Sequence, residues 1–464
     1  MHDAQTTEKR RIPPFRTVFV IGVLAVIGFS IVVTLLTWAF RGDQTPVDYA
    51  SEFCALVRAT QGTKTNGFSD LDRAIRLVEA PAFWVNADDT SLARPKGCAY
   101  DPDGFDHAVL SYGDALDVGC MTYERAMVQR FADRGVNDLI DRAAEADVIS
   151  REIESLFDPS ADSTQPLWSR LNLSDLGWLR RISYVYVVAM RLAVLEDDEE
   201  TYVDDLRRAL TLQRAGTEQF TIVEQLVATA ISSRTFGELM MQLQERRFRA
   251  DTLENIAGLL NDDRICPDIR RAVDGESVFV RDVIQWLYAD VNGRSVTVNL
   301  SRLNSMLTFM PPDRGMDAPM SSFGGALIES HQKTLDRLGE FEKELKRYTG
   351  LNAIEQSNDP FDPDQALQAL PARQPILKLM SATWVSAIQS TQSARQTIDA
   401  ARIIVAIERY RAESGELPPD LTALVPKYLE AVPTDVITGT SFMYAKTSLL
   451  SNGYALWSVG LNGT

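Results

Sequence analysis

Histidine and cysteine, which supply most metal-binding and nucleophilic sites, are scarce in this sequence. The three histidines are His2, His107 and His331, and none has the HxH or HxxxH spacing of a metal site. The four cysteines form no CxxC pair, so neither a zinc knuckle nor a thioredoxin-like redox motif is present. The sequence also lacks GxxxxGKS/T, GxGxxG and GxSxG. We therefore expect no catalytic residue and no enzymatic activity.

Positive charge is also in deficit. The chain carries 47 lysines and arginines against 64 aspartates and glutamates, a net charge of -17 at pH 7. Such a body repels phosphate backbones, so we expect no nucleic-acid partner. Hydrophobic residues at 45% and charged residues at 24% are typical of a globular chain. The mean hydropathy of -0.12 is too polar for a protein with many membrane spans.

One long segment lacks charge altogether. Residues 17–40 contain no charged side chain and lie between Arg16 and Arg41. A helix of this length spans roughly 36 Å at about 1.5 Å per residue, which exceeds a hydrocarbon core of about 30 Å. Trp38 stands near the far end, where an indole suits the membrane interface. We predict an uncleaved transmembrane helix, with a cleaved signal peptide as the alternative.

The charges around this segment predict its orientation. Four lysines and arginines precede it, whereas Arg41 is the only one between the span and Arg58. Because positive charge favours the cytoplasmic side, residues 1–16 are expected to be a cytoplasmic tail. Residues 41–464 would then lie in the periplasm, or otherwise outside the cytoplasm, and 17–40 would be the membrane contact of an inner-membrane protein.

All four cysteines fall on the predicted outer side, where disulfides persist. They are Cys54, Cys98, Cys120 and Cys266, which allow three full pairings that the sequence does not distinguish. A Cys98–Cys120 bond is favoured because it would close a loop-rich stretch. Buried free thiols are the alternative.

The body divides into a mixed region and a helical region. Residues 41–122 combine turn signals with short apolar runs and include a short helix over 47–60. Residues 123–350 have apolar positions at helical spacing, for example Leu179, Ile182, Tyr186, Ala189 and Ala193. Successive amphipathic helices with short polar turns predict an α-solenoid or an irregular bundle. The acidic run at 196–200 is interpreted as a solvated turn between two of these helices.

The C-terminal part changes character. Residues 351–376 contain four prolines and are predicted to be a linker. In residues 377–464 a long helix is expected to end near Gly415, followed by a short helix capped by Asp420 and two strands around 442–444 and 454–458. The predicted fold is therefore mostly α, with a transmembrane helix, a helical domain and a small α+β C-terminal module.

Five sequence blocks in this module resemble the type II secretion system protein G family, the major pseudopilin. In order they are Ala406–Tyr410, Gly415–Pro418, Leu424–Leu429, Val432–Asp435 and Gly453–Gly460. The resemblance implies a pseudopilin-like module with one long helix and a β-hairpin. The leader and early glutamate of that family are not matched, so we do not expect a processed pilus subunit. The whole layout is similar to uncharacterised bacterial membrane-anchored proteins that carry this module.

The same resemblance implies a calcium loop. The family binds calcium near its C-terminus, and the matching positions in this sequence are Asp435 and Asn462. Calcium prefers six to eight oxygen ligands, and an asparagine where an aspartate is expected supplies less charge. A structural role for Asp435, as the cap of a turn, is the alternative. No other cofactor is expected.

Three functions remain open from the sequence. The first is a non-catalytic, membrane-anchored envelope protein whose helical domain binds protein partners. The second is an accessory component of a type II secretion or pilus-like system, which the C-terminal module favours. The third is an envelope hydrolase with an acidic site of unfamiliar sequence, which a pocket with paired, buried carboxylates would favour.

Overall fold

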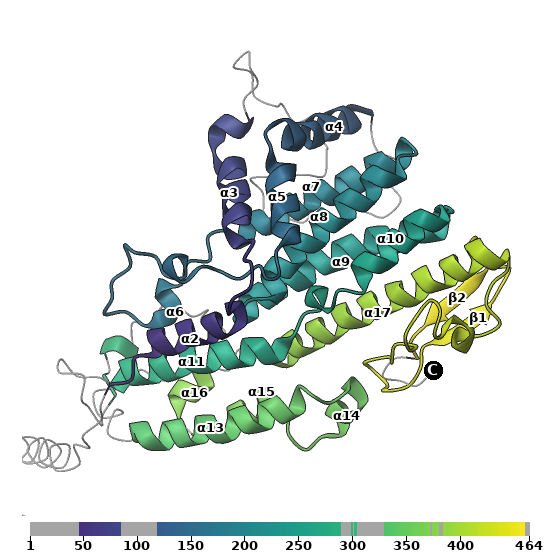
Figure 1. Cartoon of the computed structure of the whole chain (residues 1–464). Coiled ribbons are helices and arrows are strands. Elements are labelled where there is room, and N and C mark those ends of the chain that lie inside the picture. The colour runs from purple at the N-terminus through teal and green to yellow at the C-terminus, as the bar shows by residue number, and fades with distance from the viewer. Residues whose placement is uncertain are drawn as a thin grey trace, which may run out of the picture. The chain divides into compact units, whose positions relative to one another are not determined.

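The computed structural model describes residues 46–84, 118–288, 298–299, 301–303, 329–371, 374–379 and 384–459. It is mostly helical, with a small two-stranded antiparallel sheet near the C-terminus, which confirms the predicted fold class at this level (Figure 1). The predicted membrane span at 17–40 lies outside the described residues and stays a prediction. Within the described ranges, no helix has both the length and the apolar composition that crossing a bilayer requires.

The chain forms two compact units. The smaller consists of Met1–Val47, Val283–Arg337 and Leu370–Leu377, and the larger of Asp48–Asp282, Leu338–Ala369 and Lys378–Thr464. In the smaller unit, the buried hydroxyl of Tyr288 donates to the backbone oxygen of Glu329, and its ring meets the His331 ring edge-on at 5.4 Å. These contacts join two described stretches within the segment Val283–Arg337.

The N-terminal part of the larger unit is helical from its start. It contains α2 (Tyr49–Gln61), α3 (Phe68–Glu79), the 3-10 helix η1 (Pro81–Trp84), α4 (Val118–Asp133), α5 (Val136–Glu145), η2 (Ile153–Ser155) and the short α6 (Leu167–Arg170). The helix predicted over 47–60 is thus confirmed as α2, which Asp48 caps by accepting from the Ser51 amide. Phe131, Ile140 and Leu71 join α3, α4 and α5 to the next helix pair in one buried core.

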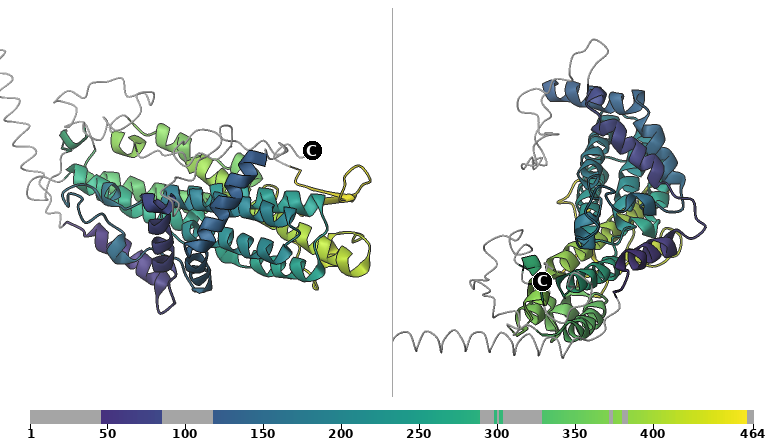
Figure 2. Two further views of the ribbon diagram at one scale, coloured as in Figure 1. Left: turned by 90° about the horizontal axis from the view of Figure 1, so that it is seen from above. Right: turned by 90° about the vertical axis from the view of Figure 1, so that its left-hand side faces the viewer.

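Four long helices continue the chain: α7 (Leu176–Leu195), α8 (Glu199–Thr217), α9 (Ile222–Glu245) and, after α10 (Ala250–Leu260) and η3 (Asp263–Ile265), α11 (Ile269–Tyr288). Helices α7, α8 and α9 pack side by side in sequence order (Figures 1 and 2). A capping box at Thr221 and Glu224 starts α9. The helices predicted from apolar spacing are therefore confirmed.

The acidic run at 196–200, between α7 and α8, was predicted to be a solvated turn, but one of its carboxylates is buried. Glu199 is buried, and its carboxylate accepts hydrogen bonds from the Arg249 amide at 3.0 Å and from the Thr252 hydroxyl at 2.5 Å. Asp197 pairs with Arg246 at 2.6 Å. The prediction failed for Glu199 because this carboxylate holds the start of α10, a helix distant in sequence.

The segment predicted as a linker contains short helices. After α13 (His331–Tyr348) come α14 (Ala353–Asn358), α15 (Pro363–Gln368) and α16 (Pro375–Leu379). Asn352 caps α14, and Asp362 caps α15 with Pro363 in its first turn. The Phe361 ring packs against Tyr348 and Phe341, so this stretch is attached to the C-terminal half of α13.

The C-terminal module forms around the longest helix of the described residues. Helix α17 (Trp384–Ser414) ends at Gly415, whose φ is +79°, and Asp420 caps η5 (Leu421–Leu424) as predicted. Strands β1 (Met443–Lys446) and β2 (Tyr454–Trp457) pair in antiparallel register, with Tyr444 opposite Leu456. One face of α17 packs on α9 and α10 through Ile398 and Val405, while Ile403 and Ile407 contact η5 and the hairpin.

Candidate functional site

Asp435, one of the two predicted calcium ligands, accepts hydrogen bonds within a turn. Its carboxylate is buried and accepts from the Ile437 amide at 2.9 Å, the Ser458 hydroxyl at 2.6 Å and the Thr438 hydroxyl at 3.2 Å. Asn462 lies outside the described residues. In the described part of the chain, no three histidine, cysteine or carboxylate residues gather as a metal site would require. Calcium binding stays a prediction, and the turn-capping role of Asp435 is observed.

Asp435 also lines a cleft of about 650 Å³. Four segments form its walls: 267–270 at the start of α11, 349–352 after α13, 391–402 on α17, and 433–439 in the C-terminal module. We call this cavity the arginine cleft, after Arg270, Arg395 and Arg402 in its lining. Its size is in the range of small-ligand pockets, about 300–1,000 Å³.

Hydrogen bonds hold the walls of the arginine cleft together. The amides of Ala353 and Ile354 donate to the carbonyls of Val436 and Ile437 at 3.3 and 3.0 Å. The Gln392 side chain donates to the Leu351 carbonyl at 3.1 Å, which fixes α17 to the same loop. The cleft is therefore a built feature where the helical domain and the C-terminal module meet within the larger unit.

Two of the three arginines in the cleft are paired with carboxylates. Arg402 bonds Asp399 at 3.0 Å, Asp263 at 3.1 Å and the Leu260 carbonyl at 2.7 Å. Arg270 pairs with Asp268 at 2.9 Å. Arg395 stands one helical turn before Asp399 and is exposed, and no described residue forms a hydrogen bond or ion pair with it. Among the described residues, Arg395 is therefore the one arginine of the lining that makes no hydrogen bond or ion pair, although its charge also acts on Asp399.

Cys266 lies beside the cleft as a free thiol. Its sulfur is 3.9 Å from Nη2 of Arg402. Burial raises the pKa of this thiol, and the positive charges of Arg402 and Arg395 oppose that rise. Cys54 is a free, buried thiol in α2. The favoured Cys98–Cys120 disulfide involves side chains outside the described residues and stays a prediction.

Several buried carboxylates belong to ion-pair networks elsewhere in the larger unit. Arg151 bonds Glu224 at 2.7 Å and Asp175 at 2.6 Å, with all three side chains buried. Glu276 accepts from the Ile222 amide at 3.0 Å, and burial raises the pKa of Glu276 to about 7. None of these carboxylates lines the arginine cleft. The paired carboxylates thus serve as internal cross-links at the start of α9.

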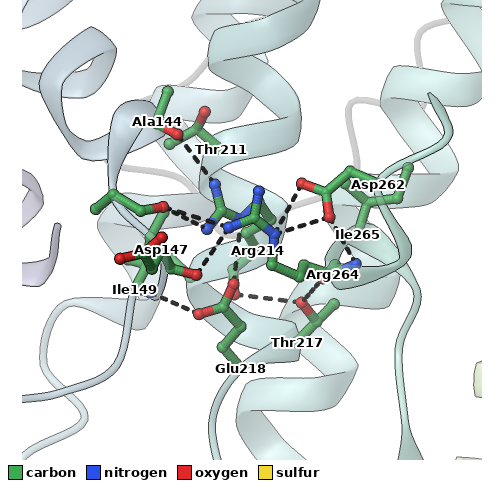
Figure 3. A network of polar contacts seen from close by, with 12 residues as sticks. Ala144, Asp147, Ile149, Thr211, Arg214, Thr217, Glu218, Asp262, Arg264 and Ile265 are labelled. Carbon is green, nitrogen blue, oxygen red and sulfur yellow. Dashed lines mark hydrogen bonds and ion pairs between the residues drawn. The ribbon is translucent and has the colours of Figure 1, made fainter. Parts of the chain in front are cut away.

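A second network joins the end of α8 to the loop after α5 (Figure 3). Arg214 donates to Glu218 at 3.1 Å and to the carbonyls of Ala144 and Ala146 at 3.2 and 3.1 Å. Glu218 in turn accepts from the Ile149 amide at 2.5 Å. Arg264 donates to the Asp147 carbonyl at 2.7 Å. The carbonyls at the end of α5 and in the loop after it are satisfied in this way, which stabilises the loop.

A smaller cavity, of about 410 Å³, lies between α9 and α17, and its lining residues carry no charge. Hydroxyl and amide side chains form most of this lining, which consists of Thr229, Ser233, Ser386, Gln389, Ser390, Ser393, Ala394 and Thr397. The hydroxyls of Thr229 and Thr397 already donate to the carbonyls one turn earlier in their own helices. This cavity therefore offers hydroxyl and amide groups, and no charged side chain, to a ligand.

Of the histidines, only His331 is described. It is buried in the smaller unit, its two ring nitrogens have no hydrogen-bond partner among the described residues, and burial lowers its pKa. His2 and His107 lie outside the described residues. The structure therefore brings no second histidine to His331 in the part it describes.

Sequence reasoning missed the arginine cleft. A signal was present, since Arg395, Asp399 and Arg402 recur at intervals of four and three residues and so share one face of a helix. The walls at 267–270 and 349–352 are distant in sequence, and no local pattern places them beside α17. No family model, curated protein or solved structure matches the chain.

Proposed function

We propose that this chain is a non-catalytic, membrane-anchored envelope protein that binds a protein partner in the arginine cleft. One observation carries the proposal: the cleft has hydrogen-bonded walls and one guanidinium without a partner among the described residues. A preformed cavity with few, well-placed polar groups is typical of a binding site. The anchor at 17–40 is part of the proposal and rests on the uncharged run and its flanking arginines.

The lining of the cleft supports binding over hydrolysis. Its carboxylates Asp268 and Asp399 are each paired with an arginine, and Asp435 is held by three hydrogen bonds. A carboxylate that acts as a general base needs to reach the proton of a substrate or water. Those three groups are already engaged with the protein, so recognition is the better use of this geometry.

A role beside a type II secretion or pilus-like system is the second candidate. The order of a long helix, a short helix and a hairpin in α17, η5 and β1–β2 supports it, together with the five sequence blocks between Ala406 and Gly460. On this candidate the partner in the cleft would be a component of such a system.

In-cell photo-cross-linking tests the proposed function. A photoreactive amino acid would replace Thr434, an exposed residue of the cleft wall, in the full-length chain in living cells. The matched control replaces Ser160, which is also exposed and lies outside the cleft. A discrete protein adduct from position 434 and none from position 160 is expected. Equal adducts from both positions, or none from either, would refute partner binding in the cleft.

A further inference from the structure

The geometry points to a specific ligand chemistry: we infer that the arginine cleft recognises a single carboxylate group, held by the guanidinium of Arg395. This inference rests on the proposed function, because it names what a partner presents to the cleft. The inference is based on hydrogen-bond donors in the lining of the cleft that have no acceptor among the described residues.

Arg395 forms no hydrogen bond or ion pair with another described residue of its own helix. Asp399, one turn later on α17, forms its ion pair with Arg402, and Arg395 acts on it through its charge without a hydrogen bond. Arg402 is itself held by the Leu260 carbonyl and by Asp263, so this pairing is fixed from the helical domain. The N–H groups of the Arg395 guanidinium therefore donate to no described residue, and the side chain lines the arginine cleft. A guanidinium binds a carboxylate through two parallel hydrogen bonds, which gives both affinity and orientation.

Other groups in the lining add donors to the same cavity. The Asn352 oxygen accepts from the Glu355 amide, while its amide nitrogen donates to no described residue and lies against the φ-positive Gly439. The hydroxyl of Thr434 likewise has no hydrogen-bond partner among the described residues. A carboxylate only accepts hydrogen bonds, so an excess of free donors is complementary to it.

The charge balance favours one negative charge over two. Asp268 and Asp399 line the cleft, and each is neutralised by one arginine. Asp435 also lines the cleft, so its three aspartates balance its three arginines. Arg395 is the one of these arginines without an ion pair among the described residues. A phosphate, at about -1.5 to -2, would leave net negative charge beside those aspartates. A carboxylate brings only one negative charge, which one guanidinium can pair with, so the excess of negative charge is smaller.

The strongly acidic body does not prevent this binding. At physiological salt, exposed charges beyond about 8 Å are largely screened. The ligand therefore responds mainly to the local guanidinium, although the net charge of the chain is -17. The cleft volume of about 650 Å³ accommodates a side chain or chain end and excludes a folded domain.

A peptide-binding measurement tests the inference on the full-length chain in detergent. The probes are short peptides of random sequence, each made with free carboxylates and with every carboxylate replaced by a carboxamide. Hexanoate is added as a small carboxylate. The variants are Arg395→Gln, Arg395→Lys and the control Arg247→Gln, which removes an exposed arginine outside the cleft.

We expect the carboxylate peptides to bind about tenfold or more tightly than their carboxamide forms. Arg395→Gln should abolish that preference, Arg395→Lys should retain part of it, and Arg247→Gln should leave it unchanged. If hexanoate binds as tightly as the peptides, the carboxylate site stands and its ligand is a small molecule. If the peptides bind more tightly, the ligand is a peptide segment.

Two results would overturn the inference. One is equal binding of carboxylate and carboxamide forms, or equal losses in Arg395→Gln and Arg247→Gln. The other is no binding of any carboxylate probe at millimolar concentration. Neither result decides the proposed function, because the adduct from position 434 reports a partner in the cleft whatever its chemistry.

Discussion

Buried arginines in the larger unit carry out two structural tasks at the level of single residues. Arg151 neutralises two buried carboxylates, whereas Arg214 satisfies the carbonyls of Ala144 and Ala146 as well as Glu218. If one member of such a network is removed, the remaining charged groups stay buried without a partner, which lowers the free energy of unfolding. The cost of substitution should therefore depend on burial and hardly on the number of bonds.

Replacing Arg151 tests this dependence. Arg151→Leu would leave Glu224 and Asp175 buried without a cation, so the free energy of unfolding should fall by about 3–5 kcal/mol. Arg73 pairs with Asp70 on the surface, and Arg73→Leu should cost less than about 1 kcal/mol. Urea denaturation followed by tryptophan fluorescence measures both. Similar losses in the two variants would contradict the buried-network account.

Glu276 predicts a pH dependence of stability. The side chain as a whole is partly exposed, but burial of its carboxyl group raises the pKa to about 7 from an ordinary value of 4.5. The folded chain therefore binds this proton more tightly than the unfolded chain does. The resulting stability is complete below pH 4.5 and is lost as the pH rises through 7, by about 3 kcal/mol.

Glu276→Gln keeps the acceptor for the Ile222 amide and removes the charge. Urea denaturation of this variant from about pH 5 to about pH 8 should therefore lack that decline and show higher stability than the parent chain at the upper end. Glu254→Gln, on the exposed face of α10, is the control and should retain the decline. A decline that persists unchanged in Glu276→Gln would assign it to another group.

At the scale of elements, close approaches between helices are made by glycines. A Cβ atom built on Gly275 of α11 would lie 2.0 Å from the Phe220 carbonyl oxygen in the turn between α8 and α9. Gly258 of α10 has no atom within 4 Å of its built Cβ. The two helical glycines thus have opposite roles, since only the first permits a tertiary contact.

Substitution of the two glycines by alanine should have effects of opposite sign. Gly275→Ala forces α11 away from a backbone atom, so we expect a loss of at least about 2 kcal/mol in unfolding free energy. Gly258→Ala should raise it by up to about 1 kcal/mol, because alanine is the better helix former. Thermal or urea unfolding distinguishes them. Equal effects would show that α11 does not need this approach.

The sequence predicted elements better than contacts, for a physical reason. Helices α8 and α9 and the β1–β2 hairpin follow from apolar spacing and turn residues, which are local properties. The buried role of Glu199 and the walls of the arginine cleft depend on residues far away in the chain. The short helices α14 and α15 were missed because the prolines of residues 351–376 indicated a linker, whereas these prolines stand at helix starts or between helices.

At the scale of the whole molecule, the proposed function requires the body of the chain to lie outside the cytoplasm, held by residues 17–40. Ser160 is exposed in the larger unit, so Ser160→Cys offers a thiol for a membrane-impermeant maleimide. Labelling in intact spheroplasts is expected. The parent chain controls for the natural cysteines. Labelling of Ser160→Cys that requires prior lysis would contradict the proposed orientation.

Within the larger unit, one site connects the helical domain with the C-terminal module. The arginine cleft uses residues at the start of α11, on α17, in the α13–α14 loop and in the C-terminal module, so a partner bound there would contact all four segments. Backbone hydrogen bonds join the segment after α13 to the C-terminal module, and the Gln392 side chain joins α17 to the same segment. Binding should therefore depend on one guanidinium and leave the fold unchanged.

The yield of the in-cell adduct from position 434 should be measured first, in chains that also carry Arg395→Gln or Arg247→Gln. Both variants lose one exposed arginine, but only Arg395 lies in the cleft. We predict that Arg395→Gln lowers the adduct yield about tenfold and that Arg247→Gln leaves it unchanged. An unchanged yield in Arg395→Gln would show that the arginine cleft does not bind the partner through this guanidinium.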